Sequence, residues 1–115
     1  MTSQAVFIEE LLCRVPQLKA VYDEHIEDNR SLLPHVLMGD VTRFVGGEGR
    51  SAPTPESTRA LLDCLEEGLL CGGKDIKELI LASFAENLIG EATTLRELRP
   101  LMGPTLRMAV DRICE

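Results

Sequence analysis

Aromatic side chains are scarce in this chain of 115 residues, which has no tryptophan, one tyrosine and three phenylalanines. Hydrophobic residues still make up 44% of the sequence, so a core is expected that consists mainly of aliphatic side chains, with leucine foremost. Such a composition favours helices, because aromatic and β-branched residues are the ones enriched in strands. The length suits one domain with one core and is too short for two.

Basic residues are in deficit. Lysine and arginine total 12 against 19 acidic residues, which gives a formal net charge of −7. This balance disfavours nucleic acid and anionic membranes as direct partners, because both bind cationic surfaces. It suits a basic protein partner, and plain solubility is the alternative explanation.

Targeting signals and membrane spans are also missing. The chain does not begin with basic residues followed by an apolar segment, and no run approaches the roughly 18 apolar residues that span a bilayer. The four cysteines, at positions 13, 64, 71 and 114, form no CxxC pair. We therefore expect a cytoplasmic protein whose cysteines are reduced thiols that pack as small apolar residues.

Apolar residues recur at helical spacing along most of the chain. Six or seven helices are expected, over about residues 3–15, 18–29, 34–45, 55–71, 74–88, 94–102 and 104–115. No segment alternates apolar and polar residues for long enough to be a strand. The sequence therefore predicts an all-α, bundle-like fold in which residues 1–115 form a single compact domain.

Residues 46–55 form the longest loop-like stretch, with three glycines and two prolines. We expect a connector between two helices, with a binding loop on a rigid scaffold as the alternative.

Asp40 raises the sharpest question about the predicted helix at 34–45. Pro34 suits its first turn, and Gly46 and Gly47 suit its exit. Asp40 lies four residues from both Val36 and Phe44, inside the expected apolar face, where a carboxylate must be paired, neutralised or aimed at something. Arg43 is within reach on the same helix. Asp40 is therefore expected either to be structural, as an ion pair or a cap for another helix, or to serve as a contact residue or general base.

Two acidic clusters are candidate partner-binding surfaces. The first consists of Asp23, Glu24, Glu27 and Asp28, with no base between Lys19 and Arg30. Its helical spacing places these side chains mostly off the apolar stripe, so they should face solvent. The second is the acidic turn of a later helix. Together with Asp40, the candidate residues are Asp23, Glu24, Glu27, Asp28, Asp63, Glu66 and Glu67.

The sequence offers no set of catalytic, cofactor-binding or metal-ligating residues. His25 and His35 lack the spacing of metal ligands, and the cysteines lack an activating pattern. The glycines at 46, 47 and 49 are not followed by the lysine of a phosphate loop. We therefore expect no enzymatic activity, no cofactor and no metal. A small hydrolase that uses Asp40 as its base is a distant alternative.

Residues 32–45 (LLPHVLMGDVTRFV), 84–90 (FAENLIG) and 98–107 (LRPLMGPTLR) resemble stretches of small all-helical bacterial proteins. Several proteins of that group are associated with polymorphic or contact-dependent toxin loci, where they act as immunity partners. The resemblance covers roughly residues 30–110 and lies in features of the fold. It implies a cytoplasmic, non-enzymatic immunity protein that binds and neutralises a cognate toxin domain by occlusion. A cytosolic helical adaptor or regulatory module is the alternative.

Overall fold

The computed structural model describes residues 3–47 and 53–114, and every regular element in them is helical. Their order is α1 (Ser3–Arg14), α2 (Leu18–Asn29), α3 (Pro34–Val45), α4 (Pro55–Cys71), α5 (Lys74–Leu79), the π-helix η1 (Ile80–Ala85), α6 (Glu86–Ile89), α7 (Ala92–Leu98), the 3-10 turn η2 (Arg99–Leu101) and α8 (Pro104–Cys114). Since α5, η1 and α6 form one continuous rod, the described residues make seven helical segments. The predicted all-α fold is confirmed.

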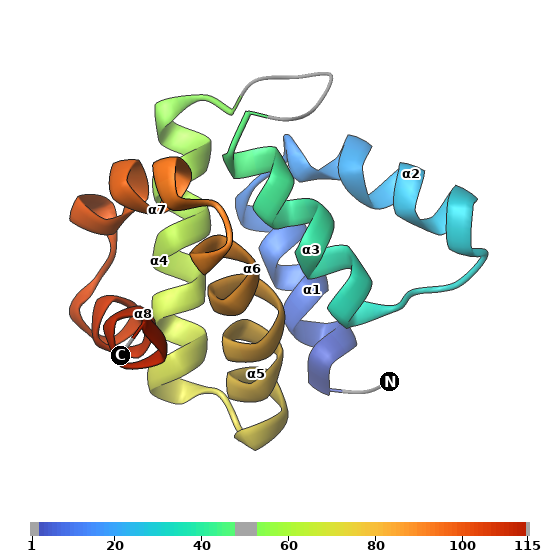
Figure 1. Ribbon diagram of the computed structural model, residues 1–115. Helices are drawn as coiled ribbons and strands as arrows, with labels where there is room; N and C mark the ends of the chain where they lie inside the picture. The colour runs from blue at the N-terminus through green and yellow to red at the C-terminus, as the bar shows by residue number, and fades with distance from the viewer. Residues whose placement is uncertain (1–2, 48–52, 115) are drawn as a thin grey trace.

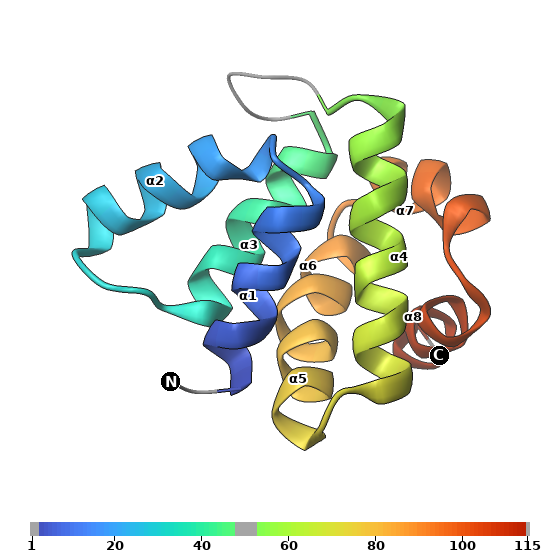
Figure 2. The ribbon, with the colours of Figure 1, turned by 180° about the vertical axis from the view of Figure 1, so that it is seen from behind.

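The rod from α5 to α6 runs through the middle of the molecule (Figure 1). It contacts α1, α3, α4 and α8 along its length, and α7 near its end. The reverse view shows α1 and α4 on the other side of this rod (Figure 2). Helix α2 projects at one edge, where its main neighbour is α3. The acidic outer side of α2 therefore belongs to the least enclosed helix of the fold.

The core is aliphatic, as the composition predicts. Leucines such as Leu11 of α1, Leu65 of α4 and Leu79 of the rod are almost fully buried. Phe7, Phe44 and Phe84 are the buried aromatic side chains among the described residues. Along the rod, the apolar residues that recur at helical spacing are all buried: Ile76, Leu79, Ile80, Phe84 and Leu88. Burial of apolar area at about 25 cal/mol per Å² makes this core the main source of stability.

Local signals place most helix ends where the sequence predicts them. At α4, the Thr54 hydroxyl accepts a hydrogen bond from the Ser57 N–H at 3.1 Å, and Pro55 occupies the first turn. After α3, Gly47 adopts a left-handed conformation with φ of +81°. The helix expected from about residue 94 begins two residues earlier, at Ala92, so Thr94 lies inside α7 and does not cap it.

Part of the predicted 46–55 loop, residues 48–52, lies outside the described residues, so neither interpretation of that loop is tested. The π-helix was not predicted from the sequence. Within η1, Ser83 is buried, its hydroxyl contacts Nδ1 of His35 on α3, and its carbonyl accepts a hydrogen bond from the Asn87 side chain. The contact with His35 joins the π-helical stretch to α3, and the bond from Asn87 joins it to the following turn of the rod.

Candidate functional site

The first acidic cluster lies on the open side of α2. Asp23, Glu24, Glu27 and Asp28 are all exposed, which confirms that they face solvent. Asp23 pairs with Lys19 at 2.6 Å. Within the described part of the chain, the other three carboxylates have no ion pair. This acidic α2 face therefore carries uncompensated negative charge.

His25 fastens the inner side of α2 to α3. Its side chain is fully buried, and its Nε2 accepts the Leu33 N–H at 3.0 Å. A neutral ring that accepts at Nε2 carries its hydrogen on Nδ1. That nitrogen lies 3.6 Å from Asp40 Oδ2, while the Asn29 side-chain amide donates to the His25 backbone carbonyl at 2.9 Å. The ring therefore has partners on both sides, and it holds α2 in a fixed position.

Asp40 lies at the edge of the apolar face of α3 and not within it. Its side chain is 28% exposed, whereas Val36, expected to be buried beside it, is 46% exposed. The buried face of α3 is formed instead by residues such as Leu37, Val41 and Phe44. The Asp40 carboxylate pairs with Arg43 and faces His25. It is therefore a paired carboxylate, as its position in the sequence requires.

The three residues of the second acidic cluster, Asp63, Glu66 and Glu67, lie in different environments. Asp63 and Glu67 are exposed, and Glu67 forms an ion pair with Arg14 of α1. Glu66 is half-buried and caps a different helix: its carboxylate accepts the Thr105 N–H at 3.0 Å and the Leu106 N–H at 2.7 Å. These are N–H groups of the first turn of α8, which have no partner within their own helix. Glu66 is thus committed to the fold and is not a free surface charge.

Gly103 explains how Glu66 can approach α8 so closely. A Cβ atom at position 103 would lie 2.5 Å from Cδ of Glu66, so a larger residue there would require the Glu66 side chain to move. Such a move would draw the carboxylate away from the N–H groups at the start of α8. Gly103 therefore leaves room for a cap from a distant residue.

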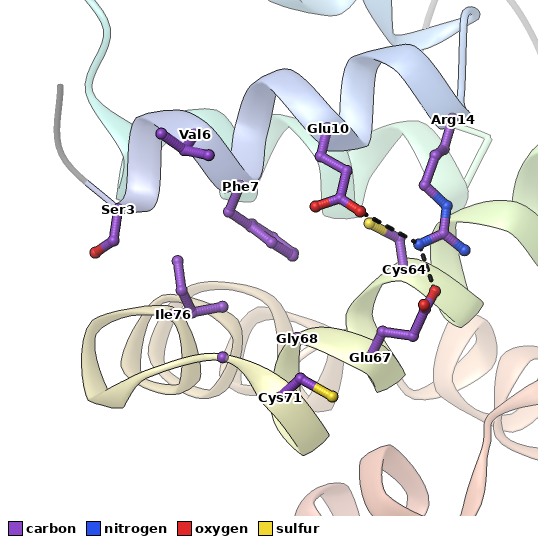
Figure 3. Close-up of a pocket in the computed structure, with 11 residues that line it drawn as sticks. Ser3, Val6, Phe7, Glu10, Arg14, Cys64, Glu67, Gly68, Cys71 and Ile76 are labelled. Atoms are coloured by element: carbon purple, nitrogen blue, oxygen red, sulfur yellow. Dashed lines mark ion pairs between the residues drawn. The ribbon is translucent and has the colours of Figure 1, made fainter.

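A groove of about 290 Å³ opens between α1, α4 and the start of α5 (Figure 3). We call it the α1–α4 groove. Its apolar end is lined by Val6, Phe7, Ile76 and the rim residue Cys71. Val6 is 51% exposed, while Phe7 and Ile76 present only their edges. Gly68 sits beneath, where a Cβ atom would lie 3.0 Å from the Phe7 ring.

The other end of the α1–α4 groove is charged. The Arg14 guanidinium pairs with Glu67 and lies 3.9 Å from Glu10 (Figure 3). The hydrogen bond to Glu67 raises the pKa of Arg14, so its positive charge is secure. Cys64 lines the same end, and burial raises the pKa of its thiol to about 11. The thiol is therefore protonated at neutral pH, which makes it a poor nucleophile.

Sequence reasoning did not find this groove. It identified Glu67 as one of several acidic candidates, but Glu10 and Arg14 come from a helix more than fifty residues away. The sequence does contain one indication of the groove. Gly68 and Gly72 are one turn apart, and neither has a side chain to fill the space between α4 and its neighbours. Partners from distant helices are not visible from local periodicity.

Two further features bear on chemistry. Among residues 3–47 and 53–114, no group of three or more histidine, cysteine, aspartate or glutamate side chains is placed to hold a metal ion. In the same residues, no helix is both long and apolar enough to cross a membrane.

Comparison with known families gives a match over most of the chain. A family model described as "Domain of unknown function (DUF7674)" matches residues 8–115, which is nearly the whole chain. No curated protein and no solved structure matches the chain significantly. The chain therefore belongs to the family described as Domain of unknown function (DUF7674).

Proposed function

We propose that this is a cytoplasmic immunity protein that binds a basic toxin domain and neutralises it by covering the toxin's active site. The single observation that supports this most is the acidic α2 face. Three of its four carboxylates lack a compensating base in the described residues, and all four are open to solvent. Charges of one sign on a surface accelerate association with a partner of opposite sign.

The way α2 is held also supports binding. Its outer side is acidic, while on its inner side His25 is buried and bonded to the backbone of the following loop. The carboxylates are therefore carried on a positioned helix and not on a loose segment. A pre-positioned surface loses less conformational freedom when a partner binds, which favours affinity.

The test first asks whether a toxin domain is encoded beside this protein, and then measures association with that domain by surface plasmon resonance at two ionic strengths. In the charge-reversed variant, Asp23, Glu24, Glu27 and Asp28 are all replaced by lysine. We expect association to slow by at least tenfold and to lose most of its dependence on salt. An unchanged association rate would remove the acidic α2 face from the interface.

A matched control separates local from overall charge. Replacing the exposed residues Glu56, Glu78, Glu91 and Glu97 by lysine gives the same change in net charge, from −7 to +1, because each substitution adds two positive charges. The control should retain more of the association rate than the α2 variant. Toxin inhibition is then scored by growth of cells that express both proteins. Binding without protection would favour the adaptor over the immunity protein.

A further inference from the structure

We infer that the α1–α4 groove is the anchoring site for an amphipathic helix of the basic partner, one that carries an aliphatic side chain and, one turn later, a lysine or arginine. This inference rests on the proposed function for the existence of a basic protein partner. It adds a surface distinct from the acidic α2 face and states which side chains that surface accepts.

The apolar end of the groove sets the first requirement. Val6 is half exposed, and together with Phe7 and Ile76 it forms one wall of an open apolar depression (Figure 3). A volume of about 290 Å³ is at or below the lower limit for sites that enclose a small molecule, which is roughly 300 Å³. The space suits one or two aliphatic side chains presented by a larger partner.

The charged end sets the second requirement. Two carboxylates, Glu10 and Glu67, share a single guanidinium, that of Arg14. Their side chains are 61% and 60% exposed, so each can accept another donor from outside. The three groups together carry a charge of −1. One cationic side chain from a partner would make the net charge of this end zero, because two positive groups would then face two negative groups.

The spacing between the two ends identifies a helix as the occupant. Val6 and Glu10 are one turn apart on α1, a rise of about 6 Å. A partner helix that lies along α1 presents residues i and i+4 at the same separation. An aliphatic residue at i and a lysine or arginine at i+4 therefore match the apolar and the charged ends, in the manner of helix-in-groove recognition.

The probe is a synthetic amphipathic helical peptide with leucine at i and lysine at i+4, titrated into the ¹⁵N-labelled full chain. We expect saturable chemical-shift changes at the amides of Val6, Gly68 and Ile76. The Glu10→Gln, Glu67→Gln double variant should raise the Kd at least fivefold, because both acceptors lose their charge. A peptide with glutamate in place of lysine should not bind. Shifts confined to α2, or no saturable shifts, would overturn the inference.

Matched controls keep the outcome clear. Glu9→Gln removes an exposed neighbouring charge outside the groove and should leave the Kd within twofold of the wild type. Val6→Asp should abolish binding, whereas Val36→Asp, at a similarly exposed valine on α3, should not. Equal effects within either pair would refute the site. Because these residues are exposed, melting temperatures are expected to stay close to the wild-type value.

Competition with the toxin domain separates the two proposals. If the toxin binds the chain and the peptide displaces it, both are supported. If the toxin binds but the peptide does not compete, the groove is not the anchor and the proposed function still stands. If the toxin does not bind at all, the proposed function fails, whatever the peptide does.

Discussion

Replacing Glu66 tests whether a side chain from α4 holds the start of α8. In the wild type, its two carboxylate oxygens accept the N–H groups of Thr105 and Leu106, at 3.0 and 2.7 Å. Hydrogen bonds to a charged group contribute more than neutral ones, and a carboxylate at a helix N-terminus also interacts favourably with the helix dipole. Glu66→Ala removes all of these interactions and leaves two partly buried N–H groups without their partner.

The expected loss in the free energy of unfolding is about 2–3 kcal/mol for Glu66→Ala, which combines the loss of a helix cap with two unsatisfied donors. Glu66→Gln should cost about 1–2 kcal/mol, because one amide oxygen still accepts while the amide nitrogen faces an N–H. At roughly 4 °C per kcal/mol, the alanine variant should melt about 10 °C lower.

Urea unfolding followed by circular dichroism measures these differences. Glu24→Ala on α2 is the matched control, because that carboxylate is exposed and has no ion pair within the described residues. The control should stay within about 0.5 kcal/mol of the wild type. A Glu66→Ala variant as stable as the control would refute the cap, as would unchanged hydrogen exchange at the first amides of α8.

Three further predictions concern other groups. Burial raises the pKa of Cys64 to about 11, so Ellman's reagent at about pH 8 should label Cys64 only after unfolding. The exposed Cys71 should react in the folded protein, and mass spectrometry of the labelled peptides distinguishes the two cysteines. The hydrogen bond from Arg99 holds the pKa of the Asp111 carboxyl below its ordinary value. The pair therefore stabilises the fold above about pH 4, and this stabilisation is lost as the pH falls through the lowered pKa. Asp111→Asn should therefore melt below the wild type at about pH 6, and the difference in melting temperature should shrink as the pH falls through the lowered pKa. Equal melting temperatures at every pH would contradict the pair. His25→Ala leaves a buried cavity and an unsatisfied backbone N–H. Chemical denaturation should show that the free energy of unfolding falls by about 2–4 kcal/mol. A decrease below about 1 kcal/mol would show that His25 does not hold α2 in place.

Much of the fold follows from local sequence. The positions where helices begin and end are specified by local signals: the spacing of apolar residues, Pro34, the cap at Thr54, and the glycines at 47 and 103. These signals act within one or two turns, so a single sequence is enough to read them. The π-helix was not predicted because its inward residues still fit a helical repeat, and the contact between Ser83 and His35 that accompanies it joins two separate helices.

The surfaces were less predictable, and the acidic residues show why. Three acidic residues of α4 look alike in the sequence but differ in the structure. Glu66 caps α8, the exposed Glu67 pairs with Arg14, and Asp63 is exposed. These differences depend on which helix lies opposite, which is set by tertiary packing. The acidic cluster on α2 was predictable because α2 has few neighbours on that side, so its own periodicity decides what faces solvent.

The π-helix also has a consequence for the two ends of the rod. Each π-type hydrogen bond spans one residue more than an α-type bond, so the helical phase changes across η1. The rod directs α5 toward α1 and α4, and α6 toward α7 and α8. Because the wider π turn holds one residue more than an α turn, deleting one residue between 80 and 85 would convert the stretch to regular α-helix and leave the two ends close to their present orientation. The π-helical stretch therefore accommodates one extra residue in the middle of the rod without changing which neighbours its two ends face.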